Sequence, residues 1–332
     1  VQMERKRIFY LDLIRAFSLF CIVWCHTNNV AFDSYLLEKV KWFFGKCGVP
    51  LFFMISGYLA FPLNKSFSEY FKGKIRRVVA PFVVWVLLYA IIELVQGKPV
   101  FVNGDILNEG SAHLWFIYVI MGLYLVVPII NPFLRAVSQK VFNLYLVLWI
   151  CTGVFPLLQH VLNSPFNEHN WMYTLYYFYG YTGYFVLGYY FKRFGEQTRL
   201  LDLKTSAFFI IVSILLTGAY FFIFKCTTVL TSDYKGVPII LYSIAMFGIL
   251  KKVAIYVEHS RWNSFVTSLS INSFGIYLFH MLVVMFVYPA IPQFSVMPNL
   301  LTTMILVVIN IAISYVVVCL VSKTRYSHYI FG

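Results

Sequence analysis

The sequence predicts an all-α, polytopic integral membrane protein, and three observations support this fold class. Of the 332 residues, 61% are apolar and only 12% are charged, whereas a soluble domain carries about 25% charged residues. The mean hydropathy is +0.77. The apolar residues form long runs, and most basic residues lie in the short polar gaps between them. This pattern excludes a soluble enzyme, a disordered protein and a disulfide scaffold.

Ten apolar runs are candidates for spanning helices, because a helix of about 17–25 apolar residues crosses a bilayer. The eighth run is short and ends at Lys251-Lys252. The runs cover residues 8–27, 44–62, 79–96, 113–131, 141–158, 173–191, 205–224, 237–250, 269–289 and 299–321. We therefore expect about ten transmembrane helices in a single domain over residues 1–332, with no soluble domain.

The distribution of basic residues predicts the orientation of these helices. Nineteen lysines and arginines fall in the gaps on one side and six in the gaps on the other, while Arg15 lies inside the first run. By the positive-inside rule both termini are cytoplasmic, so we expect a multi-pass protein of the inner (cytoplasmic) membrane. The net charge of +13 is not gathered on one aromatic-lined stripe, which excludes nucleic acid as a partner.

The six cysteines show neither a metal-ligand spacing nor a disulfide framework. Four lie inside apolar runs and two near run ends. We interpret them as small buried apolar residues and expect no metal. The two longest gaps, around residues 97–112 and 159–172, are expected on the outer side, and the polar residues in them or at their edges are Asp105, Glu109, His113, His160, Glu168 and His169.

Few ionisable residues lie inside the apolar runs, and such residues are costly in lipid and often functional. They are Asp12, Arg15, His26, Glu93 and His280. Asp12 and Arg15 are three residues apart, so on a helix they can neutralise each other. Eleven residues at about 100° each bring Arg15 and His26 within about 20° of each other around a helix, with a rise of about 16 Å. A cation and a titratable base on one stripe suit an elongated anionic ligand.

The spacing alone leaves a second interpretation of these residues open. An intramembrane histidine is often a hydrogen-bonded packing residue, and an arginine near the inner surface can be a plain anchor. A basic stretch, Lys65 to Arg77, precedes the third run and includes Lys74, Arg76 and Arg77. This stretch suits phosphates by its charge and the arginine geometry, but it is also typical of a positive-inside loop.

Five sequence stretches resemble the membrane acyltransferase-3 family. They are Tyr10-Leu-Asp12-Leu-Ile-Arg15 with His26 following; Val49-Pro50 to Ser56-Gly57-Tyr58; Arg76-Arg77 before Pro81; His113-Leu-Trp115 to Pro128; and Ser273-Phe-Gly275-Ile-Tyr277-Leu-Phe-His280. The resemblance covers almost the whole chain. It is strongest toward the short polysaccharide O-acetyltransferases, such as the enterobacterial common antigen enzyme.

Two departures from the family pattern affect what is expected of this chain. Many members have Glu five residues after the tryptophan, and this sequence has Ile120 there. Some members add a serine-esterase-like domain, and nothing of that kind follows the tenth run. We therefore expect direct transfer of the acyl group to the acceptor.

The resemblance implies an O-acyltransferase that moves an acyl group, with acetyl as the expected one, from cytoplasmic acyl-CoA to a hydroxyl of a surface glycan or its lipid-linked precursor. It implies that His26 is the general base, with Arg15 and Asp12 completing the catalytic set. The CoA phosphates are expected at Arg15, Arg76, Arg77 and Lys74. His113, Trp115 and His280 are candidate substrate-binding residues. Besides acyl-CoA and the acceptor, membrane lipids are expected partners, and the oligomeric state stays open, a homo-oligomer included.

Two alternative functions belong to other classes. A transporter or flippase for a lipid-linked sugar or small anion would favour internal repeats and paired intramembrane charges, and we find only the Asp12 and Arg15 pair. A non-catalytic partner in polysaccharide assembly would make no special use of an Arg15 and His26 stripe. Replacing His26 then changes stability rather than turnover.

Overall fold

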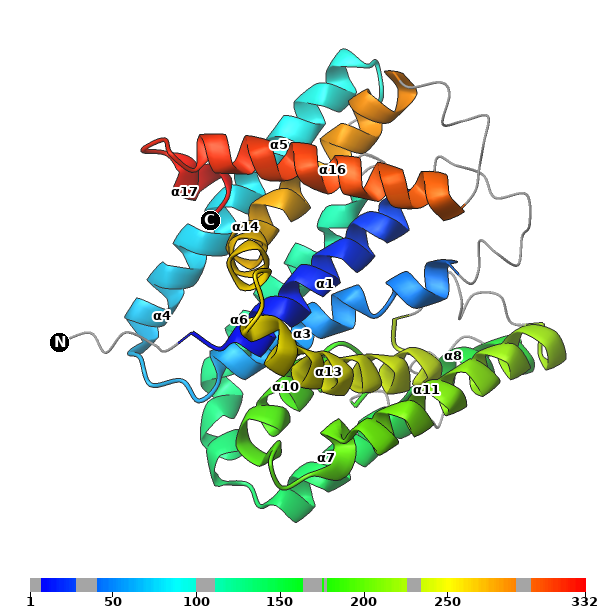
Figure 1. The fold of residues 1–332 in the computed structure, drawn as a ribbon. Helices are drawn as coiled ribbons and strands as arrows, with labels where there is room; N and C mark the ends of the chain where they lie inside the picture. Colours follow the sequence, from blue (N-terminus) through cyan, green and yellow to red (C-terminus); the bar gives the residue numbers. More distant parts are fainter. Residues whose placement is uncertain are drawn as a thin grey trace. The chain divides into compact units, whose positions relative to one another are not determined.

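A computed structural model describes residues 7–27, 41–99, 111–163, 175, 178–225, 234–290 and 300–332. These residues are predominantly helical, and no strand occurs among them (Figure 1). The chain divides into two compact units that interleave along the sequence. Unit 1 comprises residues 1–21, 39–59 and 137–271, and unit 2 comprises residues 22–38, 60–136 and 272–332.

Within the described residues, nine helices are long and apolar enough to cross a membrane. They coincide with nine of the ten expected runs and confirm a polytopic, all-α membrane protein. The remaining run, 173–191, begins among residues outside the described set, and its described helix is α10, Thr182–Phe194. Asp105, Glu109, Glu168 and His169 also lie outside the described residues.

Two boundaries differ from the sequence expectation. The helix that corresponds to the eighth run does not end at Lys251-Lys252. This helix, α13, continues to Glu258 and contains both lysines. Long lysine side chains reach water from within a helix end, so they need not terminate it. Two of the six basic residues assigned to the outer side, Lys41 and Lys46, are instead buried within the second candidate span, Lys41–Ala60. The Lys46 ammonium lies over the ring of Tyr234.

Unit 1 is built from helices of the N-terminal third and the middle of the chain. Its elements are α1 (Phe9–His26) as far as Cys21, α3 (Gly48–Ala60), α7 (Gln139–Thr152), α8 (Phe155–Leu162), α10, η3 (Arg199–Leu201), α11 (Leu203–Gly218), η4 (Ala219–Ile223), α13 (Val237–Glu258) and the start of α14 (Asn263–Leu282). Helices α11 and α13 lie side by side (Figure 1).

Small residues let α3 and α10 approach closely within unit 1. A Cβ atom at Gly57 would overlap the backbone carbonyl of Phe185, and one at Gly188 would overlap the carbonyl of Met54. Close backbone contact of this kind is a common way to join membrane helices, because lipid offers no hydrophobic drive for their association. The Ser56-Gly57 pair therefore lies in a packed helix contact, as its small residues suggest.

Unit 2 contains the remaining helices. They are the end of α1 from Ile22, α4 (Phe67–Lys74), η1 (Ile75–Val79), α5 (Ala80–Val95), η2 (Ala112–Leu114), α6 (Trp115–Ala136), α14 from Asn272, η5 (Val283–Val287), η6 (Tyr288–Ala290), α16 (Leu300–Val321) and α17 (Ser327–Ile330). Ser66 and Glu69 form a capping box that starts α4, satisfying backbone donors of the first turn.

The basic stretch before Pro81 is helical from Phe67 onward rather than a loop. It runs through α4 into η1, a π-helical segment in which Ala80 donates to the carbonyl of Ile75. Pro81 has no N–H to offer the carbonyl of Arg77, and a π-turn is one way for a helix to absorb such a break. Arg76 and Arg77 are therefore presented as exposed side chains at this irregular turn.

Helix α16 shows how unit 2 places polar groups inside and apolar groups outside. Thr303, Asn310 and Ser314 are fully buried, whereas Leu301 is 67% exposed and Val308 is 61% exposed. A helix of a soluble protein has the opposite arrangement. An apolar outer face with a polar inner face is the arrangement that lipid requires, and the buried polar side is where a functional site is expected.

Candidate functional site

Three histidines from distant parts of the sequence meet in unit 2. His26 is the last residue of α1, His113 lies in η2, and His280 lies in the last turn of α14. The ring centroid of His280 lies 5.1 Å from that of His26 and 5.1 Å from that of His113, and the His26 and His113 centroids are 6.1 Å apart. His280 and His113 are buried. All three were singled out by the sequence, and the structure gathers them into one cluster.

The hydrogen bonds of His280 and His26 assign their tautomers. His280 Nδ1 lies 2.6 Å from the carbonyl oxygen of Tyr277, and a carbonyl can only accept, so Nδ1 carries the hydrogen. In the neutral ring this leaves Nε2 of His280 as an acceptor. That Nε2 lies 3.2 Å from Nδ1 of His26, which is also 2.9 Å from the carbonyl oxygen of Ile22. The Nδ1 of His26 therefore donates, and its Nε2 is the basic nitrogen.

This assignment separates the roles of the two histidines. The lone pair of His280 is directed at His26, whereas the lone pair of neutral His26 is on the opposite side of its ring. A neutral imidazole with its Nδ1–H held by an acceptor is the arrangement that makes Nε2 a general base in the serine hydrolase triad. The cluster can thus take a proton from a substrate hydroxyl at His26 Nε2.

Aromatic residues hold the cluster from its other sides. The Tyr277 hydroxyl donates to the backbone carbonyl of His113, and the Tyr89 hydroxyl donates to the carbonyl of Leu278 at 2.9 Å. The rings of Tyr89 and Tyr277 pack edge-on against His113, with centroids 5.3 and 5.6 Å away. These contacts bring α5, η2 and α14 together around the imidazoles.

A buried amide and a phenol form a second polar layer beside the histidines. Asn310 Nδ2 donates to the backbone carbonyl of His280 at 3.1 Å and to the hydroxyl of Tyr288 at 3.3 Å. Its Oδ1 accepts from Ser314 Oγ at 3.1 Å. The Tyr288 hydroxyl also lies 3.3 Å from Oγ1 of Thr27, the residue after His26. Helix α16, η6 and the end of α1 are therefore linked through side-chain hydrogen bonds.

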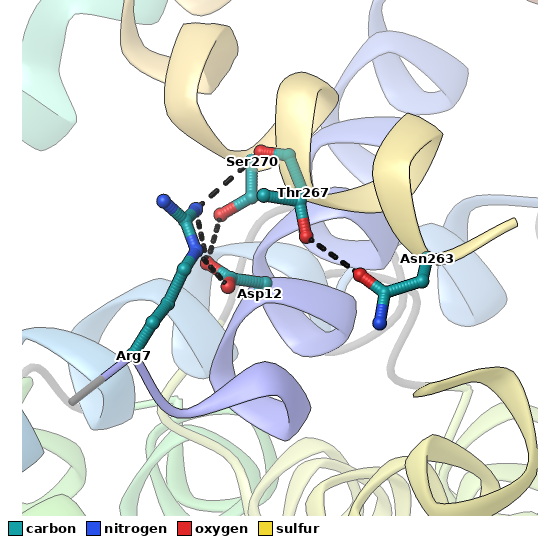
Figure 2. Close-up of polar contacts among 5 residues, drawn as sticks. All are labelled: Arg7, Asp12, Asn263, Thr267 and Ser270. Carbon is teal, nitrogen blue, oxygen red and sulfur yellow. Dashed lines mark hydrogen bonds and ion pairs between the residues drawn. The ribbon is translucent and has the colours of Figure 1, made fainter. Parts of the chain in front are cut away.

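A different cluster surrounds Asp12 in unit 1. Figure 2 shows the Asp12 carboxylate between the guanidinium of Arg7 and the hydroxyl of Ser270. Arg7 binds both carboxylate oxygens, with Nη2 to Oδ1 at 2.8 Å, and Ser270 Oγ donates to Oδ1 at 2.7 Å. Arg7 Nη2 also donates to the carbonyl of Thr267 at 3.4 Å. The ion pair described for Asp12 is with Arg7, whereas the sequence singled out Arg15.

The other expected site residues have individual placements. Arg15 is half-buried in α1, and Trp115 is half-buried as the first residue of α6. Lys74 ends α4 with its ammonium 3.3 Å from the ring centroid of Tyr124. Arg76 and Arg77 are exposed in η1. The catalytic and binding roles of these residues stay predictions.

Sequence reasoning missed several residues that the structure places around the cluster. Asn310, Tyr288 and Thr27 carry no charge, so the rarity of ionisable groups within apolar runs does not point to them. The buried amide of Asn310 inside the apolar run 299–321 was the available signal, because an amide in lipid also requires partners. Arg7 lies before the first apolar run, among the basic residues whose pattern indicates orientation.

Among the described residues, no group of three or more His, Cys, Asp or Glu side chains is arranged to hold a metal ion. The three imidazoles of the cluster meet through ring packing and one nitrogen–nitrogen contact.

The site is thus an imidazole cluster, largely buried, within a multi-pass, all-α membrane protein. The family model described as an acyltransferase domain (Acyl_transf_3) matches residues 8–319. The chain therefore belongs to the acyltransferase-3 family and is a membrane acyltransferase. Comparison with curated proteins and with solved structures gave no match. Family membership favours an enzyme over the transporter and the non-catalytic partner.

Proposed function

We propose that this protein is an O-acetyltransferase that uses cytoplasmic acetyl-CoA and modifies a hydroxyl of a surface glycan or of its lipid-linked precursor. The family match supports acyl transfer, and the resemblance of the sequence motifs to the polysaccharide branch supports the acceptor class. The single observation that carries the chemistry is the contact of His280 Nε2 with His26 Nδ1, at 3.2 Å.

The reaction uses His26 as the general base. Its Nε2 takes the proton of the acceptor hydroxyl while that oxygen attacks the thioester carbonyl of acetyl-CoA. The carbon–sulfur bond then breaks, and the imidazolium of His26 returns the proton to the departing thiolate. An O-acetyl ester and free CoA result, and His26 is again neutral.

The phosphates of acetyl-CoA are the natural ligands for the exposed cations of η1. Arg76 and Arg77 are adjacent and exposed at an irregular helical turn, and arginine binds phosphate oxygens with two parallel hydrogen bonds. Lys74, two residues before Arg76, adds a further positive charge to this segment. Under this proposal η1 faces the cytoplasm, in the inner membrane with both termini cytoplasmic, as the basic-residue distribution favours.

Binding of acetyl-CoA to detergent-purified protein tests the donor half of the proposal. Isothermal titration is expected to give micromolar affinity for wild type and at least a tenfold loss in the double variant Arg76→Ala/Arg77→Ala. Arg199→Ala/Lys204→Ala removes the same charge from exposed positions elsewhere and is the matched control. Equal affinity in all three proteins would contradict a phosphate site at η1. If folded wild type binds no acetyl-CoA, the proposed donor is wrong.

A further inference from the structure

We infer that His280 is a positioning residue for His26: its Nε2 accepts the Nδ1–H of His26, holds the tautomer in which Nε2 is basic, and stabilises the imidazolium that forms during transfer. The inference rests on the proposed role of His26 as the base. It adds a second histidine whose role is exerted through His26 and not through the substrate.

The carbonyl of Ile22 shares this function with His280. It is the carbonyl four residues before His26 in α1, and in an α-helix that oxygen is the acceptor of the backbone N–H of His26. A carbonyl oxygen has two lone pairs, so it can also accept the side-chain Nδ1–H, at 2.9 Å. His280 Nε2 supplies a nitrogen lone pair directed at the same Nδ1–H.

His280 is well held for this task. Its ring is fully buried, its Nδ1–H is bound to the Tyr277 carbonyl, and the His113 ring packs nearly perpendicular to it, at 84°. The titratable groups that face it are His26 on α1, His113 on η2 and Tyr277 on its own helix. A ring that these contacts hold in one rotamer keeps its Nε2 directed at His26.

Asn310 and Tyr288 tie the two histidines together by a second route. The amide of Asn310 binds the backbone carbonyl of His280 and the hydroxyl of Tyr288. That hydroxyl contacts Thr27, adjacent to His26. The backbones on both sides of the imidazole pair are thereby linked through buried hydrogen bonds, which are strong in a low-dielectric environment.

Solid-state NMR of protein labelled with ¹⁵N-histidine tests the tautomer directly. The His26 signals are identified by their loss in His26→Gln. In wild type at pH 8 we expect a protonated Nδ1 and an unprotonated Nε2. His280→Phe keeps a ring in the site but removes the imidazole acceptor and leaves the carbonyl of Ile22 alone, so His26 is expected to shift to a mixture with Nε2–H. His280→Gln supplies a carbonyl acceptor and is expected to retain the wild-type tautomer. An unchanged His26 tautomer in His280→Phe overturns the inference.

Transfer of radiolabel from acetyl-CoA into membrane glycans provides the catalytic readout. His280→Phe is expected to lower kcat about 10- to 100-fold, as for one hydrogen bond to a charged group, with the KM for acetyl-CoA unchanged. His280→Gln is expected to recover part of the loss, and His259→Gln, at an exposed position, is the control.

A wild-type kcat in His280→Phe contradicts the inference. A wild type that transfers no label refutes the proposed function, whereas the tautomer result still decides the role of His280.

Discussion

The two ends of α1 carry polar clusters that differ in the kind of group they hold: a carboxylate at one end and imidazoles at the other. Asp12, in the first turn, is a buried carboxylate whose charge is matched by Arg7 and whose Oδ1 also accepts from Ser270. His26, the last residue, is an imidazole whose described hydrogen bonds run to a carbonyl and to another imidazole. The first cluster stabilises a permanent charge. The second is built from imidazoles, whose ring nitrogens can take up or release a proton.

The comparison predicts that acyl transfer depends on pH through the histidine cluster. The base must be neutral, and an ordinary imidazole has a pKa of about 6.5. Activity is therefore expected to fall about tenfold for each unit of pH below the pKa of the base. Initial rates between pH 8 and pH 5, at saturating acetyl-CoA, check this. A flat profile over that range contradicts a histidine base.

The Asp12 cluster is expected to affect stability more than chemistry. Arg7→Ala leaves the buried carboxylate without its ion-pair partner, and because the Arg7 side chain is 46% exposed, the cost is about 1–2 kcal/mol rather than the larger cost of a fully buried pair. Thermal unfolding in detergent is expected to shift down by a few degrees.

Glu196→Gln is the matched control for Arg7→Ala, because it breaks the other described ion pair, between Glu196 and Lys251. Hydrogen bonding by the Lys251 ammonium holds the pKa of the exposed Glu196 carboxyl below its ordinary value. Such an exposed pair contributes little to stability, so no change in unfolding temperature is expected. If both variants unfold as wild type does, the Asp12 cluster is not a structural element.

The sequence predicted the helices more completely than the site. Long apolar runs and their basic flanks are local signals, and nine of the ten runs coincide with described helices. His26, His113 and His280 could each be singled out, because ionisable groups and motif residues in apolar runs are rare. Their convergence could not be predicted, since His26 and His280 are 254 residues apart and periodicity within one helix carries no information on which helices meet.

The same reasoning explains what the sequence did not indicate. Helical spacing points from Asp12 to Arg15, whereas Arg7 lies in the segment just before α1 and binds Asp12 from there. The π-helical turn at Arg76 and Arg77 depends on how Pro81 is accommodated, and charge counting does not register backbone geometry. Asn310 was missed because it is polar without being ionisable.

The central claim is that His26 is the base of a membrane acyltransferase. Its most direct test compares wild type and His26→Ala, purified in detergent and shown to bind acetyl-CoA equally, for acetyl-CoA-dependent acylation of membrane glycans. We predict a loss of about 10²- to 10⁴-fold in the variant, with an unchanged unfolding temperature. Equal acylation by the two proteins would contradict the account.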